Sequence, residues 1–115
     1  MPKRIVDKLV RDKIVEQMEA QGKKVTHYNL ILESEKKQKL TEKLGEKYKE
    51  LFESLIHQEQ NKDKVIDGIA DMLEIMNKIA QVREVDLKQV MARKKQKLDE
   101  KGGYENFVFI KHVEE

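Results

Sequence analysis

The feature that most constrains the fold is the helical spacing of apolar residues in two long stretches separated by one polar break. At about 100° per residue, residues 40–55 and residues 65–80 each gather their apolar side chains on one side. These side chains are Leu40, Leu44, Tyr48, Leu51, Phe52 and Leu55 in the first stretch, and Val65, Ile69, Met72, Leu73, Met76, Ile79 and Ala80 in the second. The break at residues 60–63 is short, so we expect two antiparallel neighbouring helices.

The composition favours helices over a packed β-sandwich. Aromatic residues make up 5% of the 115 residues, and the chain has one proline and five glycines, so long uninterrupted helices are possible. A chain of this length fits one domain with a modest core. We therefore predict an all-α fold, a single helical domain over residues 1–115 built as an antiparallel bundle of about four helices.

Local signals give the expected helix positions. Besides the two long helices, at about residues 35–58 and 64–83, we expect a first helix over about residues 8–18 and a fourth that ends at Gly102. Side chains able to cap the later helices are Ser34, Asp63 and Asp86. Residues 25–32 and residues 107–113 lack helical spacing and are rich in strand formers, so they could pair as a minor two-stranded β element.

Each long helix carries an acidic row beside its apolar side. Glu46 with Glu50, and Asp67 with Asp71, stand four residues apart, so each pair repels by a few tenths of a kcal/mol. A divalent cation between the helices would turn this repulsion into attraction. Ligand sets made only of oxygen atoms suit Mg²⁺ or Mn²⁺.

Lysines interleaved with these acids support a different interpretation. Lys43, Lys47 and Lys49 stand near Glu46 and Glu50 at spacings typical of a solvated, salt-bridged helix surface. The residue pattern leaves both interpretations open.

Charge and composition also limit the partners. The net charge of +2 comes from 24 basic and 22 acidic residues, which is too balanced to predict a nucleic-acid partner. The chain has no cysteine, which is compatible with a reducing compartment. No apolar run approaches the length of a membrane span, so we expect a cytoplasmic protein without a membrane partner.

Five motifs in order along the chain resemble a branch of the MazG-like, all-α nucleoside triphosphate pyrophosphohydrolases related to phosphoribosyl-ATP pyrophosphohydrolase. They are K-L-V-R-D-K-I at residues 8–14, G-K-K-V at 22–25, K-L-x-E-x-x-x-E-L at 43–51, A-D-x-L-E at 70–74 and G-G-Y at 102–104. Together they span nearly the whole chain.

The resemblance implies a Mg²⁺-dependent enzyme, with Mn²⁺ as a substitute, that cleaves the α–β phosphoanhydride of a nucleotide to a monophosphate and pyrophosphate. It implies Glu46, Glu50 and Asp71 as catalytic residues that also bind metal, together with Glu74. The cations that could hold the polyphosphate are Arg11, Lys13, Lys94, Lys97 and Lys101. The resemblance and the broad apolar side of residues 65–80 both predict a homodimer or higher homo-oligomer.

Two positions depart from the acidic motifs of that family. Lys47 and Gly68 stand where the family has glutamates. An ammonium group repels a divalent ion, and Lys47 could itself pair with Glu50 or Asp71. Gly68 costs a helix up to about 1 kcal/mol relative to alanine. The alternative function is therefore a catalytically silent family member that binds nucleotide or acts through protein partners.

Overall fold

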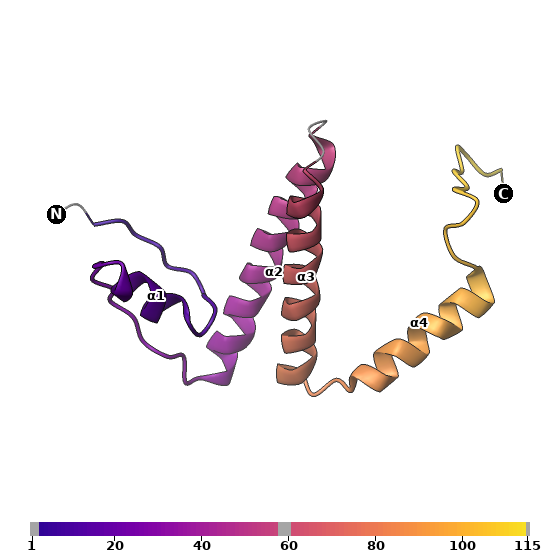
Figure 1. The fold of residues 1–115 in the computed structure, drawn as a ribbon. Helices are drawn as coiled ribbons and strands as arrows, with labels where there is room; N and C mark the ends of the chain where they lie inside the picture. The colour runs from indigo at the N-terminus through magenta and orange to yellow at the C-terminus, as the bar shows by residue number, and fades with distance from the viewer. Residues whose placement is uncertain (1–2, 58–60, 115) are drawn as a thin grey trace. The chain divides into compact units, whose positions relative to one another are not determined.

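The structure is a computed structural model that describes residues 3–57 and 61–114, and these residues form four α-helices. The helices are α1 (Ile14–Ala20), α2 (Glu33–Ile56), α3 (Lys62–Val82) and α4 (Leu87–Lys101), as labelled in Figure 1. The predicted all-α class is confirmed. Within the described residues, no helix is long and apolar enough to cross a membrane.

The predicted β pairing is wrong, because neither residues 25–32 nor residues 107–113 form a strand. Strand formers stabilise a strand only when their side chains pack against neighbours. Here Tyr28 is 80% exposed and Phe109 is 84% exposed. Phe107 also adopts a φ of 50°, in the left-handed region, which interrupts an extended backbone.

The chain divides after Glu84 into two compact units, so α1, α2 and α3 belong to the first unit and α4 to the second. We describe each unit by itself. That the whole chain acts as one domain stays a prediction.

Helices α2 and α3 form an antiparallel hairpin, which is the packed part of the first unit (Figure 1). Leu40 of α2 and Ala80 of α3 are the buried apolar residues among those described, with 5% and 8% of their surface exposed. Gly68 lets the helices approach closely, because a Cβ atom there would lie 2.8 Å from Cδ1 and 3.3 Å from Cβ of Leu51. The glycine that costs α3 helix propensity therefore has a packing role.

The helix ends agree only in part with the predicted caps. Asp86 caps α4, since its side chain accepts a hydrogen bond from the Lys88 amide at 2.8 Å. The prediction for Asp63 is wrong, because Asn61 is the N-cap of α3 and accepts from the Asp63 amide at 3.1 Å. Ser34 lies inside the first turn of α2 and does not cap it. Helix α1 is shorter than predicted, since it begins at Ile14 rather than near residue 8.

Candidate functional site

A lysine from α2 links the acidic rows of the two long helices. The Nζ atom of Lys47 lies 3.2 Å from Oε2 of Glu50 on the same helix and 3.6 Å from Oδ2 of Asp71 on α3. Lys47 and Asp71 are both largely shielded, with side-chain exposures of 22% and 25%. The pairing of Lys47 with both Glu50 and Asp71, which the sequence suggested as alternatives, is therefore present.

An arginine from the segment before α1 pairs with two acids of α3, one of which is Asp71. Nη2 of Arg11 donates to Oδ1 of Asp71 at 2.7 Å, and Nη1 donates to Oε2 of Glu74 at 2.5 Å. These hydrogen bonds, first to Glu74 and then to Asp71, raise the pKa of the Arg11 guanidinium. We call Arg11, Lys47, Glu50, Asp71 and Glu74 the ion-pair cluster.

Glu46 lies next to the ion-pair cluster and pairs with two other lysines. Its carboxylate accepts hydrogen bonds from Lys43 Nζ at 3.2 and 3.3 Å, and Lys8 Nζ lies 3.5 Å away. Burial works to raise the pKa of Glu46, but the hydrogen bond from Lys43 and the charges of Lys43, Lys8 and Lys47 outweigh it and hold the pKa below 4.5.

The structure brings together only part of the predicted site. Glu50, Asp71, Glu74 and Arg11 meet in the ion-pair cluster, with Glu46 next to it, whereas Lys13 makes no ion pair with any described residue. The exposed lysines Lys94, Lys97 and Lys101 lie on α4, in the second unit.

Lys8 and Lys43 were not predicted as site residues. The signal for Lys8 was its place in the K-L-V-R-D-K-I run, three residues before Arg11.

The carboxylates do not fit a divalent ion in this conformation. Across residues 3–57 and 61–114, no three acidic, histidine or cysteine side chains are grouped so that they could hold a metal. The acids predicted as metal ligands instead face ammonium or guanidinium groups of the chain itself. Their oxygen atoms remain of the type that Mg²⁺ prefers.

Comparison of the chain with protein-family models, curated proteins and solved structures found no match. The resemblance to MazG-like pyrophosphohydrolases therefore rests on the motifs alone.

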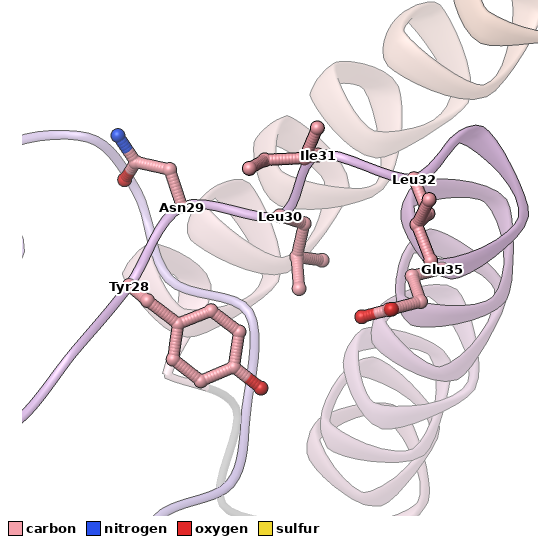
Figure 2. A pocket seen from close by; sticks show the side chains of 6 residues that line it. All are labelled: Tyr28, Asn29, Leu30, Ile31, Leu32 and Glu35. Carbon is pink, nitrogen blue, oxygen red and sulfur yellow. The ribbon is translucent and has the colours of Figure 1, made fainter.

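A shallow pocket of about 310 Å³ lies elsewhere, where residues 28–32 lead into α2. The ring of Tyr28 and the side chain of Leu30 turn to the same side of the chain as the carboxylate of Glu35 (Figure 2). This pocket has an acid and no cation in its lining, so it does not suit an anionic nucleotide.

Charge pairing in the site predicts a pH dependence of stability. Because the pKa of folded Glu46 is lowered, its pairing stabilises the fold above pH 4.5 and is lost as the pH falls through the folded pKa. Glu46→Gln is therefore expected to reduce the loss of stability between about pH 7 and about pH 3, measured by urea unfolding. The matched control is Glu53→Gln, because Glu53 is exposed and has no ion pair with a described residue. If the free energy of unfolding of Glu46→Gln falls with pH as steeply as that of the natural chain, the pairing of Glu46 does not stabilise the fold.

Lys47 makes the stability of the fold depend on pH at the alkaline end of the range. Burial works to lower its pKa, but the hydrogen bond to Glu50 and the charges of Glu50, Asp71 and Glu46 raise it overall. A raised lysine pKa stabilises the fold below pH 10.5 and stops doing so as the pH rises through the folded pKa.

Arg11 is expected to hold the segment before α1 against the hairpin. Arg11→Lys keeps the charge but loses the fork that reaches Asp71 and Glu74 together, so residues 8–12 should become more mobile. We expect lower ¹⁵N heteronuclear NOE values for these residues in the variant, and unchanged values in Lys13→Met. Equal values in the natural chain and in Arg11→Lys would show that the ion pairs do not order this segment.

Proposed function

We propose that this chain is a nucleotide pyrophosphohydrolase of the MazG-like type, which cleaves the α–β phosphoanhydride of a nucleoside triphosphate. The observation that carries the proposal is a convergence in space. The K-L-V-R-D-K-I run supplies Arg11, the acidic motif of α2 supplies Lys47 and Glu50, and the A-D-x-L-E motif of α3 supplies Asp71 and Glu74. Segments about 60 residues apart in sequence thus place their charged groups together.

The ion-pair cluster contains cations that can bind phosphate oxygens and carboxylates that can orient a water molecule. Arg11 already presents its donors and is 54% exposed, so a triphosphate can compete with Asp71 and Glu74 for the guanidinium. A carboxylate released from Arg11 or Lys47 can accept a proton from a water molecule and orient it. Lys13, Lys94, Lys97 and Lys101 are proposed as further phosphate-binding residues.

Mg²⁺, with Mn²⁺ as a substitute, is the proposed cofactor, and its chemistry would be to neutralise charge on the phosphate oxygens. Glu50, Asp71 and Glu74 could bind it only after Lys47 and Arg11 leave their carboxylates, and Glu46 only after Lys43 and Lys8 leave its carboxylate. The exposed pair of Arg11 with Glu74 contributes about 0–1 kcal/mol, so breaking it costs little. The pair of Lys47 with Asp71 is largely shielded and costs more to break. The proposed assembly is a homo-oligomer, and the proposed compartment is the cytoplasm.

Lys47 favours a second candidate function, a catalytically silent family member that binds nucleotide or a protein partner. Its ammonium group lies 3.2 and 3.6 Å from two of the proposed metal ligands. A permanent cation there can neutralise the acids without a metal, which preserves the fold while removing the reaction.

Turnover measurements separate the two candidates. Pyrophosphate release is measured over canonical and base-modified nucleoside triphosphates with Mg²⁺ or Mn²⁺, alongside equilibrium binding of the same nucleotides. Hydrolysis by the natural chain, reduced about 100-fold or more in Asp71→Asn and unchanged in Lys49→Glu, supports the pyrophosphohydrolase. Lys49 is a suitable control because it is exposed on α2 and has no ion pair with a described residue.

If the natural chain binds nucleotides but hydrolyses none of them with either metal ion, the pyrophosphohydrolase proposal is rejected and the catalytically silent family member is favoured. Turnover that survives in Asp71→Asn would place the chemistry outside the ion-pair cluster.

A further inference from the structure

The irregular segment before α1 is held against both helices of the hairpin by charged side chains. We call residues 5–11 the N-terminal strap. Nζ of Lys8 lies 3.5 Å from Oε1 of Glu46 on α2, and Arg11 pairs with two acids of α3. Three residues of chain span at most about 11 Å, so the strap crosses from one helix to the other over a short distance.

Besides these ion pairs, little holds the N-terminal strap in place. Across residues 3–57 and 61–114, no backbone hydrogen bond involves residues 5–10, and no side chain of the strap is buried. Ile5 is 77% exposed, and Val6 and Val10 are 41% and 40% exposed. Asp7 has a φ of 46°, in the left-handed region that residues other than glycine rarely adopt, so the closed strap carries a conformational cost.

The groups that the strap contacts are shielded, whereas its own cations are open to solvent. Glu46 and Asp71 have side-chain exposures of 23% and 25%, and the lysines of α2 that pair with these two acids are exposed to 14% and 22%. Lys8 and Arg11 are 56% and 54% exposed. An anion in solution can therefore reach the cations of the strap before it reaches any group below them.

A polyphosphate suits these two cations better than a single small anion does. Guanidinium and ammonium groups bind phosphate oxygens through charge-assisted hydrogen bonds. Because Lys8 and Arg11 stand three residues apart on flexible side chains, one polyphosphate chain can contact both of them. Ion pairs of such exposed cations are weak, so a ligand with several negative charges can replace the carboxylates.

We propose that the N-terminal strap is a gate that a polyphosphate opens by binding Lys8 and Arg11 together and taking them from Glu46, Asp71 and Glu74. Opening exposes these acids on the charged side of the hairpin. The choice of a polyphosphate rests on the proposed function, because a nucleoside triphosphate is the polyphosphate expected there. The fastening of the strap by ion pairs does not depend on that function.

Distances between pairs of spin labels, measured by electron paramagnetic resonance, test the gate. The chain has no cysteine, so labels can be attached to introduced cysteines alone. The strap pair is Ile5→Cys with Lys49→Cys, and the reference pair within the hairpin is Lys49→Cys with Asp67→Cys. All three positions are exposed, and none forms an ion pair with a described residue. Labelled chains are diluted with unlabelled chains, so that only distances within one chain are measured.

We expect the strap pair to give one narrow distance distribution at low salt. The distribution should become broad and shift to longer distances in Lys8→Gln/Arg11→Gln, and in about 1 M NaCl, where charges are screened beyond about 3 Å. Inorganic triphosphate should cause the same change at an ionic strength at which NaCl does not. A non-hydrolysable nucleoside triphosphate that acts at a lower concentration would identify the nucleotide as the natural source of the phosphates. The reference pair should stay unchanged throughout, which shows that the hairpin remains folded.

A narrow strap distance that persists in 1 M NaCl or in the double variant would overturn the proposal and show that apolar contacts hold the segment. Release by NaCl and by the double variant, but by neither polyphosphate, would overturn the assignment of the ligand. A strap that polyphosphate opens in a chain without turnover would reject the hydrolase and leave the gate supported.

Discussion

Gly68→Glu is expected to lower the free energy of unfolding by about 2 kcal/mol or more, because it forces α2 and α3 apart. The first added atom, Cβ, would lie 2.8 Å from Cδ1 of Leu51, and the rest of the side chain needs further space. The Cδ1 atom can move by rotation of the leucine, but the Leu51 Cβ atom at 3.3 Å cannot. Urea unfolding followed by circular dichroism, at one fixed protein concentration, measures the change.

Gly45→Ala is the matched control within α2. No atom lies within 4 Å of the added Cβ there, so the gain in helix propensity acts alone and should stabilise the protein by up to about 1 kcal/mol. Shortening Leu51 to alanine in the Gly68→Glu background should restore part of the loss, because it removes the clashing atoms. If Gly68→Glu unfolds at the same urea concentration as the natural chain, the close approach of the helices at this position is wrong.

Lys47→Glu is expected to make the stability of the protein depend on divalent ions. The substitution removes the cation between Glu50 and Asp71 and adds a carboxylate in its place, with Glu46 nearby. In the presence of a chelator, like charges should lower the free energy of unfolding by about 1–2 kcal/mol. Mg²⁺ or Mn²⁺ at about 100 times its dissociation constant should then add about 2.7 kcal/mol.

Thermal unfolding with and without the ions measures this effect. Lys47→Met is the control that removes the cation without adding an acid, and Lys49→Glu adds an acid outside the ion-pair cluster. Both should respond to ions no more than the natural chain does. A melting temperature of Lys47→Glu that ignores millimolar Mn²⁺ would show that the carboxylates do not converge closely enough to share an ion.

The long helices were predictable because apolar spacing is a repeated signal, as in the row from Leu40 to Leu55. Single-residue signals were less secure. Asp86 was recognised correctly as a cap, but Asn61 and Asp63 are both good capping residues two positions apart, and only the backbone decides between them. Residues 25–32 and 107–113 have strand-forming composition, yet strand formation depends on packing partners that local sequence does not specify.

The contacts of Lys47 in the site were predictable from the sequence, whereas those of Arg11 were not. Helical spacing placed Glu50 near Lys47, and a pairing of Lys47 with Asp71 was foreseen. The reach of Arg11 to Asp71, 60 positions away, depends on an irregular segment whose path has no periodic signal. Gly68 was interpreted only as a cost to helix propensity. A glycine inside an apolar helical run is also a signal for close packing, and here it indicated the contact with Leu51.

The most direct measurement asks whether a nucleotide binds at the ion-pair cluster. The natural chain is titrated with a nucleoside triphosphate analogue whose α–β bridging oxygen is replaced by CH₂, while NMR follows the Arg11 guanidinium and the Lys47 ammonium group. We predict saturable shifts of both signals, because the triphosphate must take Arg11 from Asp71 and Glu74. Saturable binding that leaves both signals unchanged, or no binding at all, would contradict a phosphoanhydride site at this position.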